Sequence, residues 1–315
     1  MHEQMLNKIK EGFLVGVIFV GLLLMTLVIP AIELLTLFIL PIPIAFFAYR
    51  QGWKAAALLG VIIGLTLFLF AMYMFIVSLP LTLLAVLTGT LMGQSIKAKR
   101  HPYETWVQGT LGFVMGFIVL LFFVEWLSDV SLATEYQLFV SESITSTQLL
   151  FDQLGMTLSG DDLQLVEEQM LMVLDLIPSI IVVTSMLLAV ITQFFTYKVL
   201  NKSIGTALAF PPFRRFNLPR LALWLYFVIM IITWFELEQG SSFQTLIGNA
   251  SLIIGVLFSL QGFSFIFHYM HVKKQPRFVA VLITVFSLII LPVGLYLSRI
   301  LGIIDIGFMM KKRLK

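Results

Sequence analysis

The chain alternates between long apolar runs and short polar or charged segments. Runs of roughly helix length occupy residues 12–29 and 34–48, and a longer run without charged side chains covers residues 55–96. Further apolar runs follow at residues 105–126, 172–197, 221–237, 245–268 and 278–298. A helix that spans a bilayer needs about 20 mainly apolar residues, and Pro80 is expected to divide the uncharged run into two helices. The pattern therefore predicts an all-α, polytopic transmembrane bundle of about eight to nine spans.

The distribution of charge predicts the side of the membrane on which each loop lies. No Lys or Arg occurs from His101 to Tyr197, although 11 of the 17 carboxylates lie there. Basic clusters flank this stretch, at residues 97–100 and 198–220. Because basic loops beside membrane helices stay in the cytoplasm, residues 127–171 are predicted to form a long acidic extracytoplasmic segment between helices five and six. The protein is then a multi-pass protein of the cell membrane with a cytoplasmic N-terminus.

Composition supports a helical membrane protein and excludes other classes. Hydrophobic residues make up 59% of the chain and charged residues 12%, with a mean hydropathy of +1.01, which excludes an ordinary soluble domain. The apolar runs are continuous and do not alternate with polar residues, so a barrel is excluded. The net charge of +3 does not indicate nucleic-acid binding, because the basic residues lie in short loops. Without cysteine, the chain forms no disulfide and has no thiolate chemistry.

Two capping boxes predict short amphipathic helices in the acidic segment. Thr134 with Gln137, and Ser159 with Asp162, have the spacing that this motif requires. Pro178 is expected to kink the entry into the sixth membrane helix.

The end of the chain leaves two arrangements open. A single helix over residues 278–298 ends outside when counted from a cytoplasmic N-terminus, but the tail after residue 310 is basic. Either there are nine spans and an exposed basic tail, or residues 301–310 re-enter and the tail is cytoplasmic. Residues 301–310 are too few to span a bilayer, and placing the charge of Asp305 in lipid costs free energy. We divide the chain into an N-terminal membrane half, the acidic segment, a C-terminal membrane half and a basic tail, at residues 1–126, 127–171, 172–300 and 301–315.

No motif typical of a catalytic or cofactor site occurs. A Gly-rich phosphate loop, a nucleophile elbow and a His-Glu-x-x-His motif are all absent from the sequence. His268 and His271 have helical spacing, but without a carboxylate nearby in the sequence they are interpreted as interfacial side chains. Polar residues inside the helices, Gln193, Asn249 and Gln261, are expected to make interhelical hydrogen bonds. We predict that the protein is not an enzyme and has no catalytic residue, metal or cofactor.

Glycines spaced four residues apart predict close helix packing. Such pairs occur at Gly12/Gly16, Gly60/Gly64, Gly89/Gly93 and Gly112/Gly116. Small residues allow two helices to approach closely in lipid. The pairs are interpreted either as packing within the chain or, for Gly12 and Gly16 of the first helix, as docking on another membrane subunit.

Carboxylates and tryptophans gather at the predicted outer ends of the helices. The candidate ligand-binding residues are Glu33, Glu125, Trp126, Trp234 and Glu236, which are interpreted as the lining of one outward cavity. Glu33 is the sharpest candidate, because the short turn before it leaves it little room to leave the bundle. In the alternative interpretation, the carboxylates only mark translocated helix ends and the aromatic residues form the interfacial belt.

The predicted cytoplasmic loop at residues 198–220 is long for a helix connection, which usually takes about 2 to 8 residues. Within it, Phe213 and Phe216 flank Arg214 and Arg215, and three prolines prevent a continuous helix. These four residues are the candidate partner-docking strip, which suits lipid headgroups or an acidic partner helix. The alternative is a topology signal that only contacts lipid.

The overall plan and two short motifs resemble a known family. The motifs are residues 212–220, Pro-Phe-Arg-Arg-Phe-Asn-Leu-Pro-Arg, and residues 301–305, Leu-Gly-Ile-Ile-Asp, before the basic tail. With them, the chain resembles the YybS-like family of bacterial multi-pass membrane proteins over nearly its whole length. That family is thought to be distantly similar to the S components of energy-coupling-factor transporters. The resemblance implies a solute that binds from outside and docking on an energising module through small residues of the first helix, a role that Gly12 and Gly16 match loosely.

Two functions from different classes follow as predictions. The first is a solute-binding subunit of a transport system, with a small-molecule solute and another membrane subunit as partners. The second is a non-transporting scaffold or regulator, whose basic cytoplasmic loops recruit a partner protein or anionic membrane lipid. Neither function involves nucleic acid.

Overall fold

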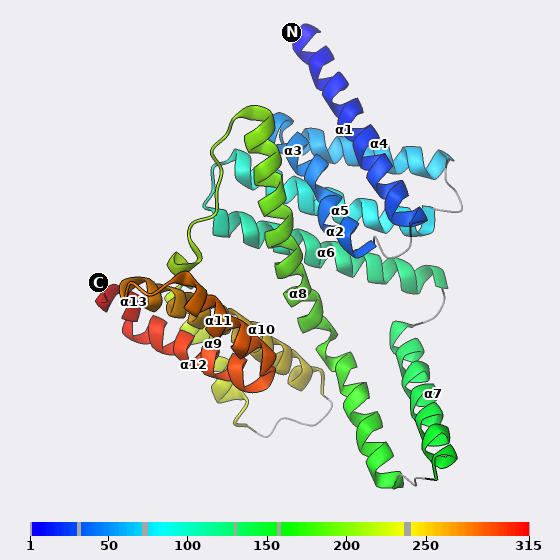
Figure 1. Cartoon of the computed structure of the whole chain (residues 1–315). Coiled ribbons are helices and arrows are strands. Elements are labelled where there is room, and N and C mark those ends of the chain that lie inside the picture. Colours follow the sequence, from blue (N-terminus) through cyan, green and yellow to red (C-terminus); the bar gives the residue numbers. More distant parts are fainter. Residues whose placement is uncertain are drawn as a thin grey trace. The chain divides into compact units, whose positions relative to one another are not determined.

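Every element formed by the described residues is a helix (Figure 1). The computed structural model describes residues 2–29, 33–70, 75–128, 131–155, 159–235 and 241–314. Within these ranges, 6 helices are long and apolar enough to cross a membrane, and shorter apolar helices of 10–17 residues accompany them. The prediction of an all-α chain with several candidate membrane helices is confirmed, whereas the number of spans stays a prediction.

The chain forms two compact units, which we describe separately. Unit 1 comprises Met1–Leu174 and Thr184–Ala209, and unit 2 comprises Asp175–Val183 and Phe210–Lys315. Unit 1 holds α1 (His2–Val28), α2 (Glu33–Ile39), α3 (Pro41–Gln51), α4 (Trp53–Phe70), α5 (Phe75–Lys97), α6 (Pro102–Ser128), α7 (Leu132–Gln153) and most of α8 (Gly160–Ile204). Unit 2 holds the short 3-10 helix η1 (Phe213–Arg215), α9 (Arg220–Ile232), α10 (Ser242–Val272), α11 (Arg277–Ile289), α12 (Leu291–Phe308) and α13 (Met310–Arg313).

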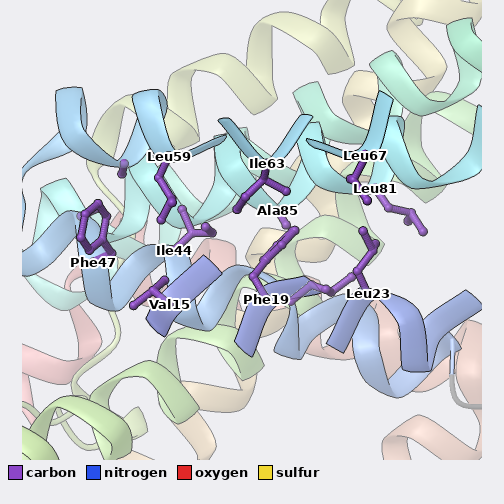
Figure 2. Packing of buried hydrophobic residues seen from close by; sticks show 13 residues of the cluster. Val15, Phe19, Leu23, Ile44, Phe47, Leu59, Ile63, Leu67, Leu81 and Ala85 are labelled. Atoms are coloured by element: carbon purple, nitrogen blue, oxygen red, sulfur yellow. The ribbon is translucent and has the colours of Figure 1, made fainter. Parts of the chain in front are cut away.

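Helix α1 buries one face against its neighbours in unit 1. Val15, Phe19 and Leu23 recur every four residues, which places them on one side of a helix. Figure 2 shows them in a buried cluster with side chains of α3 and α4, among them Phe47 and Leu59. The run predicted as the first membrane helix is therefore a packed part of unit 1.

Glycines bring three helices of unit 1 close together. Gly89 and Gly93 on α5 face the backbone of α3, where a Cβ at Gly89 would lie 2.6 Å from the carbonyl oxygen of Pro41. Gly112 and Gly116 on α6 face α5 in the same way, and a Cβ at Gly112 would lie 2.5 Å from a backbone Cα. The prediction of close packing is confirmed for these two pairs, and both pack helices within the chain.

The prediction that Pro80 separates two helices is wrong. Helix α4 ends at Phe70, and α5 begins at Phe75 and contains Pro80. A proline removes one backbone hydrogen bond, but neighbouring helices make this tolerable in a membrane helix. Helix α5 has such neighbours, because it packs against α3, α4 and α6.

The acidic segment contains helices that are longer than predicted. Ser131, not Thr134, caps α7, and its hydroxyl accepts a hydrogen bond from the backbone N–H of Ala133. Ser159 caps α8 as predicted, with its hydroxyl 3.2 Å from the backbone nitrogen of Asp162. The helices have 22 and 45 residues, so they are not short. Pro178 lies inside α8, and the location of this segment outside the cell stays a prediction.

The prediction of one helix over residues 278–298 is also wrong. The run is divided at Ile290, whose φ of −92° and ψ of 61° are not helical, so that α11 and α12 form a tight pair. Gly294 on α12 faces the backbone carbonyl of Ser287 on α11, where any Cβ would collide. With 13 residues, α11 is about 20 Å long and is shorter than the hydrocarbon core of a bilayer.

The turn at Ile290 brings the basic tail back to the C-terminal end of α10. The Lys311 amine lies 2.8 Å from the hydroxyl of Ser264, and a ring nitrogen of His268 lies 3.4 Å from the carbonyl oxygen of Leu314. Residues 301–308 belong to α12, so the tail returns at the end of that helix. Within unit 2, the tail and the turn between α10 and α11 therefore lie at the same end.

The pairing of α11 with α12 predicts on which side of the membrane fused reporters will lie. Reporters fused after Lys274 and after Lys315 are expected to report the same compartment, which the basic residues at both places predict to be the cytoplasm. A fusion after Gly155, in the acidic segment, is expected to report the opposite side. Opposite signals from the first two fusions would contradict the turn at Ile290.

Candidate functional site: an ordered basic loop

The loop at residues 210–220 in unit 2 folds onto α10. Its prolines limit regular structure to the single turn of η1. The ring of Phe213 stacks on that of Phe216, with centroids 6.2 Å apart, and meets the ring of Phe267 on α10 edge-on at 5.6 Å. The Phe216 side chain is 5% exposed. The aromatic residues of the predicted strip therefore hold the loop against the helix.

Two polar side chains of α10 satisfy the backbone of this loop. The hydroxyl of Ser264 lies 2.7 Å from the carbonyl oxygen of Phe213 and 3.1 Å from that of Phe216. Gln261 accepts a hydrogen bond of 3.0 Å from the N–H of Leu218. Both Gln261 and Ser264 are fully buried. Buried backbone groups outside regular helices need hydrogen-bond partners, and here the two side chains supply the bonds that a helix would make within its own backbone.

A buried ion pair completes the same network. The Lys311 amine lies 3.3 Å from the carboxylate of Asp305, and their side chains are 12% and 2% exposed. Lys311 also donates to the carbonyl oxygen of Phe216 at 2.7 Å, and Gln261 donates to Asp305 at 2.5 Å. Burial lowers the pKa of Lys311, and the Asp305 carboxylate opposes that change. The basic tail thus fixes the loop through one carboxylate of α12.

Around this network, cationic side chains face outward. The exposed members are Arg215, Arg220, Lys312 and Arg313, which we call the basic surface. Arg214, beside them in the loop, is partly buried. Among the described residues, none of these five side chains forms an ion pair, because the two ion pairs found join Glu11 with Arg50 and Asp305 with Lys311. The basic surface therefore offers positive charge without a counterion among the described residues, on backbone that the network holds in place.

The described residues do not test the predicted outer cavity. The side chain of Glu33 and the whole of Glu236 lie outside them. Glu125 and Trp126 are exposed near the end of α6 in unit 1, whereas Trp234 is 76% exposed in unit 2. The carboxylate of Glu125 accepts a hydrogen bond of 3.3 Å from the N–H of Leu132. Ligand binding by these residues stays a prediction.

The glycines of the first helix face the chain itself. A Cβ at Gly12 would lie 3.4 Å from the ring of Phe47, and one at Gly16 would lie 3.7 Å from the side chain of Leu59. These are ordinary contacts, and both glycines also line an apolar groove between α1 and α4. Docking of another subunit there stays a prediction.

The sequence interpretation found only part of this network. Gln261, Asn249 and Gln193 make interhelical hydrogen bonds as predicted, to Asp305, to Ser179 and to the Pro102 carbonyl oxygen. It missed that Asp305 pairs with Lys311, since it treated the carboxylate only as a cost in lipid. It also missed Arg299, which lies within α12 with its guanidinium against Gly255 of α10. The signal for Arg299 was a cation within an apolar run of the sequence.

Comparison with known proteins supports the predicted resemblance. A sequence model for a family described as "Predicted membrane protein (DUF2232)" matches residues 17–306. The chain is 25% identical over 308 residues to a protein of Bacillus subtilis (strain 168) titled "Uncharacterized protein YybS", covering 98% of each chain. No solved structure matches the chain. The chain therefore belongs to the DUF2232 family of predicted membrane proteins.

Proposed function

We propose that the protein is a non-transporting membrane scaffold that recruits an acidic cytoplasmic protein through the basic surface. The observation that supports this proposal is the fixed loop, whose carbonyl groups accept hydrogen bonds from Lys311 and Ser264. Attraction to anionic lipid needs only charge near the surface, and a disordered basic loop supplies that equally well. Fixing the loop in advance lowers the entropy lost on binding, which favours recognition of a shaped partner.

The charge of the basic surface determines the chemistry of the partner. Unpaired arginines and lysines attract carboxylates and speed encounter with an acidic surface. The positive-inside rule predicts that this end of unit 2 faces the cytoplasm. We therefore infer a cytoplasmic partner with an exposed acidic segment.

Charge reversal tests this role. The variant Arg215→Glu with Lys312→Glu is expected to insert normally and to lose at least about tenfold of its copurifying acidic partner, because like charges then face each other. The control, Lys273→Glu with Lys274→Glu, reverses two exposed charges in the turn after α10 and is expected to retain the partner. Reversal of the matching carboxylates on the partner should restore binding. Partner retention is measured by quantitative mass spectrometry. If both variants retain the same partners equally, the basic surface serves only to anchor the protein to the membrane.

The solute-binding subunit is the second proposal, and Arg299 supports it. Arg299 lies near the middle of α12, and its Nε is buried without a hydrogen-bond partner among the described residues. A cation at such depth often marks a substrate pathway. The same purified protein distinguishes the two proposals: a bound small anion, identified by mass spectrometry and lost from Arg299→Gln, favours solute binding.

A further inference from the structure

Unit 2 contains a pocket of about 340 Å³ beside the fixed loop. Its apolar wall is formed by Phe213, Phe267, Met270 and Ala280, and its polar wall includes Arg214, His271 and Arg277. Three separate segments contribute: the loop, the last turn of α10 and the first turns of α11. Ala280 is 1% exposed, whereas Arg214 is partly buried and Arg277 is exposed. We call the buried apolar part of the lining the floor, and the two arginines the rim.

The rim carries positive charge without a counterion. Among the described residues, no carboxylate lines the pocket, and neither Arg214 nor Arg277 forms an ion pair. Both guanidinium groups line this pocket, so an anion bound in it can interact with both. The planar guanidinium donates two parallel hydrogen bonds to phosphate oxygens, so arginine is the residue that suits a phosphate group.

The position of the pocket indicates which phosphate compound it binds. It lies where the apolar helix α10 ends and α11 begins, and the turn between them carries Lys273 and Lys274. In a membrane protein, such a junction between apolar helices and a basic turn lies at the depth of the lipid headgroups. A soluble anion gains nothing from contact with the phenylalanine and methionine wall. The glycerol and first methylene groups of a lipid can pack against it.

We propose that this pocket binds the headgroup of an anionic phospholipid, with the phosphate between Arg214 and Arg277 and the start of the acyl chains on Phe213 and Phe267. The volume is at the lower end of the range for small-molecule sites, about 300–1,000 Å³, so it accepts the headgroup region and not a protein helix. The proposal does not rest on the scaffold role, because the basic surface is formed by other side chains.

The test measures lipid binding by the full chain in detergent. Short-chain phosphatidylglycerol or phosphatidylcholine is titrated into the purified protein, and bound lipid is counted by native mass spectrometry. The pocket variant is Arg214→Gln with Arg277→Gln, and the matched control is Lys273→Gln with Lys274→Gln. Each basic residue beside an anionic headgroup contributes about fivefold in affinity, so the pocket variant is expected to bind phosphatidylglycerol about 25-fold more weakly than the parent. The control is expected to bind like the parent.

Several results would overturn the proposal. Equal binding of phosphatidylcholine and phosphatidylglycerol by the parent would exclude a charge-selective site. Equal losses in the pocket variant and the control would indicate diffuse charge only. Displacement of the lipid by inorganic phosphate at equal concentration would indicate a site for a soluble anion. If the double variant does not fold, Arg277→Gln alone and the floor-filling Ala280→Leu replace it, and unchanged binding in both would equally reject the pocket.

Discussion

Replacement of Asp305 by alanine is expected to destabilise the protein by about 3 to 5 kcal/mol, because it leaves the Lys311 ammonium buried without its counterion. The carboxylate also accepts hydrogen bonds from Gln261 and from the backbone N–H of Lys311, so the change removes three contacts from one network. The loop at residues 210–220 is expected to lose its protection against hydrogen exchange. Denaturant unfolding in mixed micelles and exchange mass spectrometry measure the two effects.

A double variant separates the ion pair from ordinary packing. Lys311→Met alone is expected to destabilise by a similar amount, since it leaves Asp305 charged at 2% exposure. The single variant Asp305→Leu and its combination with Lys311→Met complete the cycle. The combination removes both charges, and it is expected to recover most of the stability lost in the single variants. Losses that simply add in the double variant would show that the two side chains do not act as a pair.

Alanine at Gly262 is expected to destabilise by about 3 kcal/mol or more, because overpacking against an immovable neighbour costs at least the usual 1 to 3 kcal/mol. A Cβ at this position collides with the backbone carbonyl of Ser298 on α12. Gly302 meets the carbonyl of Phe258 from the other side, so neither helix has room to withdraw without separating from its neighbour. Thermal unfolding in detergent measures the effect.

Gly248 provides the matched control on the same helix. It lies on α10, and a Cβ there meets no atom within 4 Å. Alanine in an open helical position lowers the entropy of the unfolded chain, so Gly248→Ala is expected to stabilise by about 0.5 to 1 kcal/mol. The same substitution at two positions of one helix should therefore change the free energy of unfolding in opposite directions. A similar response at both positions would contradict the close approach of α10 and α12.

The helices were predictable where apolar length alone determines them. The runs at residues 105–126 and 245–268 lie within α6 and α10, because lipid requires a continuous helix. The division at Ile290 was harder to predict, since the residues around it are as apolar as the rest. The signal was Pro292, which occupies the first turn of α12, where its missing N–H costs little. Pro80 was wrongly predicted to end a helix, because the helices packed against α5 allow a proline inside it.

The candidate site was only partly predictable for a related reason. The strip of Phe213 to Phe216 was found from its composition, but its partners on α10 and in the tail lie far away in the sequence. The pairing of Asp305 with Lys311 does not follow helical spacing. Met309 between them has a left-handed backbone, with φ of 51° and ψ of 46°, which turns the chain back toward the carboxylate. No periodicity in the sequence indicates such a turn.

The position of Lys311 in the chain also bears on the order in which the protein is made. Phe216 leaves the ribosome long before Lys311, and α9, α10, α11 and α12 all lie between them. During synthesis the loop can therefore contact α10 before the tail is made, but it lacks the Lys311 contact until all four helices have followed. Because Lys312 and Arg313 also belong to the tail, the basic surface is complete for a partner only when unit 2 has been assembled.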